Sequence, residues 1–212
     1  MLKKILRKIY GARPFNSADY WELRYAAGGN SGDGSYGRLS EFKAGFIQKF
    51  LDEHPISSVV ELGCGDGHQL SMINYPSYTG LDISPSIVEK CRKEFSKDLS
   101  KKFLVYQPAA FEPALQEQSE LALSMDVVFH LVEEQNYRKY LHDLFSLSSK
   151  YVIIYSTNFS EYECAHILHR KFSDDVANGF PAWKLIGHQV NPFRGNGKQE
   201  SMADFYVYAK NG

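Results

Sequence analysis

From Pro55 to about residue 156 the chain alternates short runs of β-branched and aromatic residues with helical stretches. This alternation is typical of βαβ units, in which helices cover both faces of a parallel sheet. We therefore predict an α/β fold with a doubly wound, mostly parallel sheet. The expected strands lie near Ser58–Leu62, Tyr78–Leu81, Phe103–Tyr106, Leu121–Met125 and Tyr151–Ser156, with helices near His68–Asn74, Pro85–Phe95 and Glu133–Ser148.

The end of the chain departs from this pattern. Trp183–Val190 and Ala203–Ala209 are strand-like runs joined by turn-forming residues, with no helix between them. Strands connected in this way pair antiparallel. They extend the predicted sheet to seven strands, with a terminal antiparallel hairpin.

The first 54 residues are expected to form an N-terminal helical cap with a glycine-rich lid loop, ahead of a sheet domain over residues 55–212. Helical patterns run over Ser17–Tyr25 and from Leu39 to Leu51. Between them, five glycines fall within residues 28–37. Because glycine is conformationally free, this loop is either a mobile linker or a segment that wraps closely around a ligand.

Composition narrows the class of protein. The chain is 43% hydrophobic and 23% charged, which indicates a globular protein. Lys+Arg 24 against Asp+Glu 25 gives no basic field, so we expect no nucleic-acid partner. Three scattered cysteines predict reduced thiols and a cytoplasmic location. Residues 1–10 form a basic amphipathic stretch, either a surface helix or a loose membrane contact, and no stable membrane insertion is expected.

The most informative stretch is the turn that follows the first predicted strand. It reads Gly63-x-Gly65-x-Gly67, just after Glu61, and its glycines let the backbone approach a ligand. A dinucleotide-binding turn would read Gly-x-Gly-x-x-Gly, so a nicotinamide-dependent oxidoreductase is disfavoured. The next strand ends in Asp82, whose carboxylate is placed to bind a ribose diol.

With the SMDVVFHLVE run after the fourth strand and the terminal hairpin, these motifs make residues 56–210 resemble the class I S-adenosylmethionine-dependent methyltransferases. The resemblance implies a Rossmann-like enzyme with S-adenosyl-L-methionine as cofactor and S-adenosyl-L-homocysteine as product. Asp82 would bind the ribose, and no acid stands at residues 107–111 for the adenine amino group. Purely structural capping by Glu61 or Asp82 is the alternative. The implied cofactor-binding residues are Glu61, Gly63, Cys64, Gly65, Gly67, Asp82, Ile83, Ala110, Phe111, Met125, Tyr36 and Arg38.

The segment after the fourth strand carries the candidate catalytic groups. Loops beyond the carboxyl ends of parallel strands hold the reacting groups in such sheets, which places Asp126 and His130 at the site. Methyl transfer from a sulfonium is an in-line displacement that depends on alignment, and it needs a base only when the acceptor must lose a proton. We predict His130 as the base, with Asp126 as its partner or a substrate anchor. A structural histidine is the alternative.

A metal site is another use of such side chains, but neither spacing matches a known ligand set, and no metal is expected. The groups considered are Asp126, His130, Glu133 and Glu134 in one segment, and Cys164, His166 and His169 in another.

The acceptor site is expected to include Asn158 and a helix that carries His166 and Arg170 four residues apart on one face. Such a pair can hold a phosphate or carboxylate, although a solvated face is the alternative.

The overall pattern is similar to small bacterial methyltransferases loosely associated with surface-polysaccharide gene sets. This implies O-methylation of a sugar or nucleotide-sugar hydroxyl in polysaccharide biosynthesis. A non-catalytic cofactor-binding module and a methyltransferase for a non-sugar small molecule are the alternatives.

Overall fold

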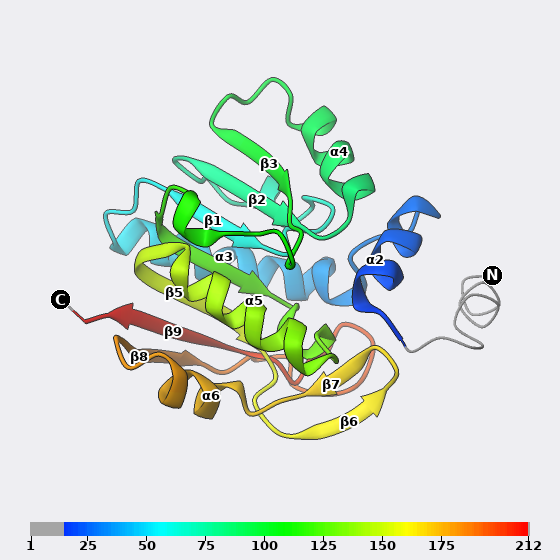
Figure 1. Ribbon diagram of the computed structural model, residues 1–212, viewed down its shortest axis with the longest axis vertical. Helices are drawn as coiled ribbons and strands as arrows, with labels where there is room; N and C mark the ends of the chain where they lie inside the picture. Colours follow the sequence, from blue (N-terminus) through cyan, green and yellow to red (C-terminus); the bar gives the residue numbers. More distant parts are fainter. Residues whose placement is uncertain (1–14, 212) are drawn as a thin grey trace.

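The computed structural model describes residues 15–211, and a seven-stranded sheet runs through its centre (Figure 1). The strand order is β3-β2-β1-β4-β5-β9-β8, with β1 to β5 parallel and β9 antiparallel to both of its neighbours. The predicted mostly parallel sheet with a terminal antiparallel hairpin is confirmed. The strands are β1 Val59–Leu62, β2 Tyr78–Asp82, β3 Lys101–Val105, β4 Ser119–Met125, β5 Ser148–Ser156, β8 Trp183–Gln189 and β9 Asp204–Lys210.

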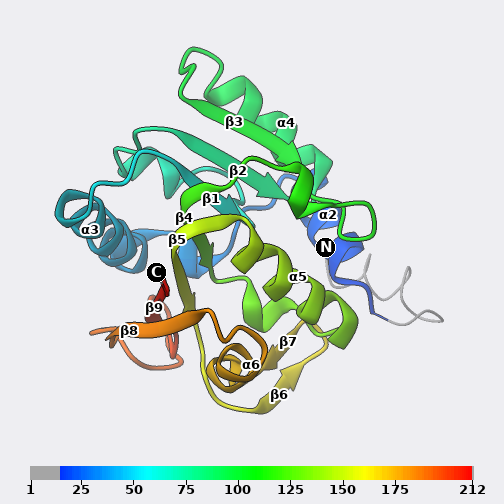
Figure 2. The ribbon, with the colours of Figure 1, turned by 60° about the vertical axis from the view of Figure 1, so that its left-hand side comes forward.

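Helices cover both faces of the sheet, and α3 and α5 lie on opposite sides of it (Figure 2). Ile47 of α3 and Val88 of α4 belong to the core on one face, and Leu144 of α5 and Val176 of α6 belong to the core on the other. Since α3 shares the core of the sheet, the predicted boundary at residue 54 does not separate two cores. The helices are α2 Ser17–Ala26, α3 Gly37–Glu53, α4 Pro85–Glu94, α5 Glu134–Ser146 and α6 Phe172–Gly179.

Local sequence explains where these elements form. All four residues of β1 are buried, as expected for a parallel strand that is covered on both faces, so buried and exposed residues do not alternate along it. Helix α4 begins at Pro85, and the Ser84 hydroxyl accepts a hydrogen bond from the Ile87 amide at 3.2 Å. Proline in the first turn after a capping serine is a favourable helix start.

The helix predicted over residues 68–74 is wrong, because only a 3₁₀ turn, Leu70–Met72, forms there. The Ser71 hydroxyl donates to the His68 carbonyl at 2.6 Å, and the Asn74 amide donates to Gln48 of α3 at 2.9 Å. A serine side chain that binds nearby backbone competes with helix formation, and the Asn74 amide is held by a residue outside the segment. Pro76 follows closely and leaves no room for a longer helix.

The helix predicted to carry His166 and Arg170 is also wrong. The segment forms the hairpin of β6, Glu161–Cys164, and β7, Ile167–His169, which stands apart from the main sheet. The His166 ring stacks on Tyr20 of α2 at 4.9 Å, a tertiary contact that helical periodicity does not encode. His166 and Arg170 therefore do not share a helix face.

Two expectations concern the membrane. Across residues 15–211, no helix has both the length and the apolar character needed to cross a bilayer. The basic amphipathic stretch over residues 1–10 lies outside the described residues.

Candidate active site

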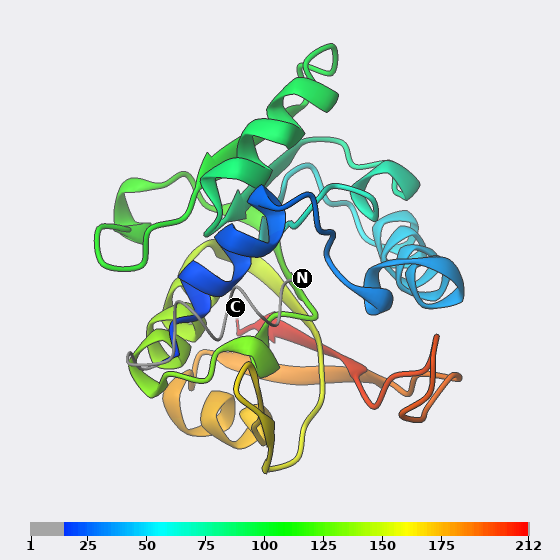
Figure 3. The same ribbon diagram turned by 90° about the vertical axis from the view of Figure 1, so that its right-hand side faces the viewer.

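A cavity of about 970 Å³, its open mouth included, lies at the carboxyl end of the parallel strands. The cavity lies where strand order reverses between β1 and β4, the usual ligand position in an open α/β sheet. Helix α2, dark blue in Figure 3, crosses this end of the sheet and contributes Trp21 and Tyr25 to the wall.

The glycine turn after β1 forms the floor of the cavity. Gly63 and Gly65 have φ of 89° and 57°, a left-handed backbone that favours glycine. A Cβ atom at Gly63 would collide with Val127, and one at Gly65 would collide with the Ser31 hydroxyl. Both positions therefore require glycine for conformation and for space.

The glycine-rich loop at residues 28–37 packs on this turn. The Ser31 amide and the Tyr36 hydroxyl donate to the Asp66 carboxylate at 3.0 and 2.6 Å. Burial alone would raise the pKa of Asp66, but hydrogen bonds from Tyr36, Ser31 and His68 outweigh it and lower that pKa. The loop is thus packed against the glycine turn, and its Ser31 and Ser35 line the cavity, whereas close wrapping around a ligand stays a prediction.

Two buried carboxylates stand at the ends of β1 and β2. Burial raises the pKa of Glu61 to about 7, although a hydrogen bond from Tyr78 and the charge of Lys43 act in the opposite direction. Burial raises the pKa of Asp82 to about 6, against hydrogen bonds from the Ser84 and Gly65 amides. Both acids line the cavity, so a ligand with an ammonium or hydroxyl group could donate further hydrogen bonds to their carboxylates.

His130 lies in the opposite wall, in a short 3₁₀ turn after β4. Its Nδ1 is 2.9 Å from the carbonyl oxygen of His166, and a carbonyl can only accept, so Nδ1 carries the proton. Burial lowers the pKa of His130 to about 4. The ring is therefore neutral near pH 7, and its Nε2 has a free lone pair. The Trp21 ring packs edge-on against it at 5.0 Å.

Asp126 directly follows β4 and has a left-handed backbone, with φ of 60°. Its carboxylate pairs with the buried ammonium of Lys43 on α3, and its amide donates to the Tyr155 carbonyl at 3.0 Å. No hydrogen bond joins Asp126 to His130 among the described residues, so the carbonyl of His166 is the group that orients the histidine. The predicted pairing of Asp126 with His130 thus has no direct hydrogen bond, and a role as substrate anchor stays a prediction.

The structure brings about half of the predicted site residues together. Those that line the cavity are Glu61, Gly63, Cys64, Gly65, Asp82, Ile83, Met125, Asp126 and His130. Those outside its lining are Tyr36, Arg38, Gly67, Ala110, Phe111, Asn158, His166 and Arg170.

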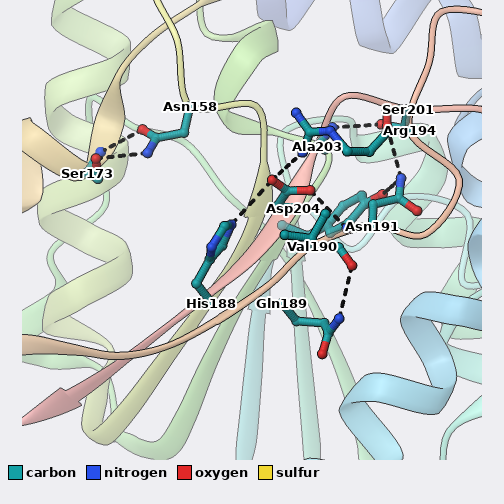
Figure 4. Close-up of polar contacts among 11 residues, drawn as sticks. Asn158, Ser173, His188, Gln189, Val190, Asn191, Arg194, Ser201, Ala203 and Asp204 are labelled. Carbon is teal, nitrogen blue, oxygen red and sulfur yellow. Dashed lines mark hydrogen bonds and ion pairs between the residues drawn. The ribbon is translucent and has the colours of Figure 1, made fainter.

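Several of these outer residues have structural contacts of their own. Arg38 donates to the Gln199 carbonyl at 2.7 Å, and Arg170 pairs with Glu134 at 2.7 Å. Asn158 exchanges hydrogen bonds with Ser173 at the start of α6, close to the Asp204 network at the start of β9 (Figure 4). These contacts hold each of the three side chains within the protein, although Nε of Arg170 has no hydrogen-bond partner among the described residues.

Several other residues that line the cavity were not identified from the sequence, because most of them lie outside any motif. Trp21 and Tyr25 reach the cavity from α2, and Ser31 from the loop. Asp66, which sits inside the glycine motif, is the one with a sequence signal, because a carboxylate between two turn glycines is placed to hold a loop. Across residues 15–211, no cluster of three or more His, Cys, Asp or Glu side chains is arranged to hold a metal ion.

Comparison with known proteins agrees with this geometry. Residues 59–150 match the family model described as a methyltransferase domain. Comparison with curated proteins gave no match.

Solved structures share the fold. The N-methyltransferase NodS from Bradyrhizobium japonicum WM9, in complex with S-adenosyl-L-homocysteine, superimposes with a TM-score of 0.72 at 12% identity, over 93% of this chain and 100% of that chain. Magnesium protoporphyrin IX methyltransferase from Synechocystis PCC 6803 gives 0.64 at 15% identity, over 99% and 100%. A small RNA methyltransferase gives 0.62 at 15% identity, over 84% of this chain and 26% of that chain.

At these identities the likeness establishes the fold, and the substrates named belong to those proteins. An RNA-modifying enzyme is among the neighbours, so the expected absence of a nucleic-acid partner stays a prediction. The glycine turn, the sheet order and the matching family model agree with one another. Residues 59–150 therefore match a methyltransferase domain, and the sheet that contains them has the fold of these solved methyltransferases.

Proposed function

We propose that this chain transfers the methyl group of S-adenosyl-L-methionine to a hydroxyl of a small polar acceptor, with His130 as the base. The observation that carries the proposal is the neutral histidine in the cavity wall, whose protonated nitrogen is fixed by the His166 carbonyl. A base of this kind suits an oxygen acceptor, which must lose a proton.

The described residues fit the cofactor. Asp82 and Glu61 are buried acids at one end of the cavity, and each has a raised pKa because burial disfavours its charge. In our proposal Asp82 accepts hydrogen bonds from the ribose hydroxyls and Glu61 faces the ammonium group. The turn at Gly63 and Gly65 lets the chain approach the ligand closely. S-adenosylmethionine supplies a methyl group on a positively charged sulfur.

His130 would act through Nε2. As the acceptor oxygen gains the methyl group, its proton becomes strongly acidic, so a base of low pKa is sufficient to take it. The fixed Nδ1 proton keeps Nε2 as the hydrogen-bond acceptor. The hydroxyl proton passes to Nε2, and the imidazolium formed then loses it to solvent.

A sugar hydroxyl is the acceptor that we favour. Trp21 and Tyr25 give the cavity aromatic surface on which a sugar ring can pack, and Asp126 can accept a hydrogen bond from a second hydroxyl. The link to polysaccharide biosynthesis rests on the sequence similarity described above. The fold itself is compatible with other acceptors.

Calorimetric titration with S-adenosylmethionine, S-adenosylhomocysteine and NAD is the first test. We expect the first two to bind and NAD not to bind. Transfer of a labelled methyl group to a panel of free sugars, nucleotide sugars, amines and RNA then identifies the acceptor class. Binding without transfer to any of them would favour the non-catalytic module.

The base is tested with His130→Ala, which should keep cofactor affinity and slow transfer roughly 100-fold or more. His142→Ala is the matched control, because that side chain is 63% exposed on α5. Equal activity of both variants would contradict the role of His130.

A further inference from the structure

Lys43 interrupts the apolar stripe with which α3 packs on the sheet. Leu39 and Ile47, on either side of it, are buried hydrophobic residues, and the Lys43 side chain is only 1% exposed. Burying an ammonium group is costly unless it is paired, and an apolar side chain would pack here without that cost. Packing alone therefore does not explain a lysine at this position.

The ammonium lies directly behind the cavity wall. It pairs with Oδ2 of Asp126, and it lies 5.3 Å from the centroid of the Tyr155 ring. Its charge also acts on Glu61, whose pKa it lowers against the larger effect of burial. One buried cation thus pairs with Asp126 and acts electrostatically on Glu61, and both carboxylates line the cavity.

The charges in the wall itself are all negative. Among the described residues, the charged side chains that line the cavity are Glu61, Asp66, Asp82 and Asp126, with no lysine or arginine. Asp126 directly follows β4, four residues before His130, and because the proposed function makes His130 the base for the acceptor hydroxyl, we place the reacting methyl group close to this segment. The left-handed backbone of Asp126 and its amide hydrogen bond to Tyr155 hold it there.

The reaction changes the charge at this point. When the S–CH₃ bond breaks and the O–CH₃ bond forms, the sulfur goes from a sulfonium to a neutral thioether. Carboxylates close to the sulfur stabilise the charged donor more than the transition state, so an uncompensated negative field opposes transfer. A buried cation behind those carboxylates offsets that field.

We propose that Lys43 is a positioning residue for methyl transfer: its ammonium pairs with Asp126 and offsets the negative field of the cavity at the reacting sulfur. The pair prevents the site from holding the charged donor much more tightly than the neutral product. This inference rests on the proposed function, because it requires the donor sulfur to lie near the end of β4.

The test needs no acceptor. S-adenosylmethionine and S-adenosylhomocysteine differ by one methyl group and its charge, so the ratio of their Kd values reports the field at the sulfur. Lys43→Met should increase the preference for S-adenosylmethionine about tenfold, the scale of unit charges about 10 Å apart at an effective dielectric constant of about 20. Asp126→Asn should change the ratio in the opposite direction.

The double variant separates this role from a structural one. Lys43→Met with Asp126→Asn removes both charges, so its ratio should return to within about twofold of the unaltered protein. Lys101→Met is the matched control, because Lys101 is 13% exposed and pairs with Asp98 at the opposite end of the sheet. That variant should leave the ratio unchanged.

The outcomes distinguish a failure of the proposed function from a failure of the electrostatic role of Lys43. If the unaltered protein binds neither ligand, the proposed function fails, and this inference fails with it. If both ligands bind but the ratio stays within about twofold in Lys43→Met and in Asp126→Asn, Lys43 has no electrostatic role and the proposed function stands. If Lys43→Met does not fold, Asp126→Asn and the double variant still test the sign and the cancellation.

Discussion

The pH dependence of cofactor affinity tests the site most directly through Glu61. Burial raises the pKa of this carboxyl to about 7, so in the free protein it keeps its proton at pH 6. If Glu61 faces the cofactor ammonium, the proton must leave before the two groups can pair. Affinity for S-adenosylmethionine should therefore rise as pH rises through the pKa of Glu61.

The magnitude follows from the ionised fraction. With a pKa of about 7, the carboxyl is about 9% ionised at pH 6 and about 76% ionised at pH 7.5, so Kd should fall about eightfold. Asp82, whose pKa is about 6, should add about twofold in the same direction. The α-amino group of the cofactor, with an ordinary pKa near 8, is mostly protonated over this range.

Isothermal titration at pH 6.0, 6.75 and 7.5, in two buffers with different ionisation enthalpies, measures both the affinity and the protons released. Glu61→Gln is the control: it should bind more weakly and keep only the contribution of about twofold from Asp82. Affinity that is constant within twofold from pH 6 to 7.5, with no buffer dependence of the enthalpy, would refute the reasoning.

Four further predictions concern the same end of the sheet. Asp82→Ala should weaken S-adenosylmethionine binding about 10- to 100-fold, the scale of lost hydrogen bonds to a charged group, and unchanged affinity in a titration would remove the ribose assignment. Gly65→Val should abolish binding because its side chain would meet Ser31, whereas Gly45→Ala on α3, where a Cβ meets nothing within 4 Å, should bind normally. Tyr36→Phe removes the hydroxyl that donates to Asp66, so Kd should rise about three- to tenfold and the loop should be cleaved faster in limited proteolysis. Since burial raises the folded pKa of Glu61 to about 7, above the ordinary range of a carboxyl group, the ligand-free protein should lose stability as pH rises from about 5 to about 7.5, and a melting temperature that is equal at about pH 5.5 and 7.5 would contradict this.

The sheet was predictable because its signals are local. The strands β1, β2 and β4 read as short and mostly buried runs, and each is followed by a turn or a helix that the same stretch of chain encodes. The glycine turn follows β1, and Asp82 is the last residue of the neighbouring strand β2. Because the two strands are parallel, both features lie at the same end of the sheet. Their common location in the cavity follows from that arrangement.

The errors occurred where local patterns compete with contacts from elsewhere. The segment that carries His166 has helical spacing, but it forms a hairpin whose turn packs on Tyr20 of α2. The short stretch after the glycine turn is fixed by Gln48 of α3, 26 residues away from the amide that it binds. Neither contact leaves a mark in the local periodicity.

The sequence by itself determined the succession of the strands in the main sheet, the glycine turn and the acids at the strand ends, because those features depend on residues close together in the chain. Only the tertiary structure decided how the site is completed. Lys43 meets Asp126 across 83 residues, Tyr36 meets Asp66 across 30, and the His166 carbonyl sets the tautomer of His130 across 36. The polar contacts that set charge, orientation and protonation at a site are long-range, and they exist only after the chain has packed.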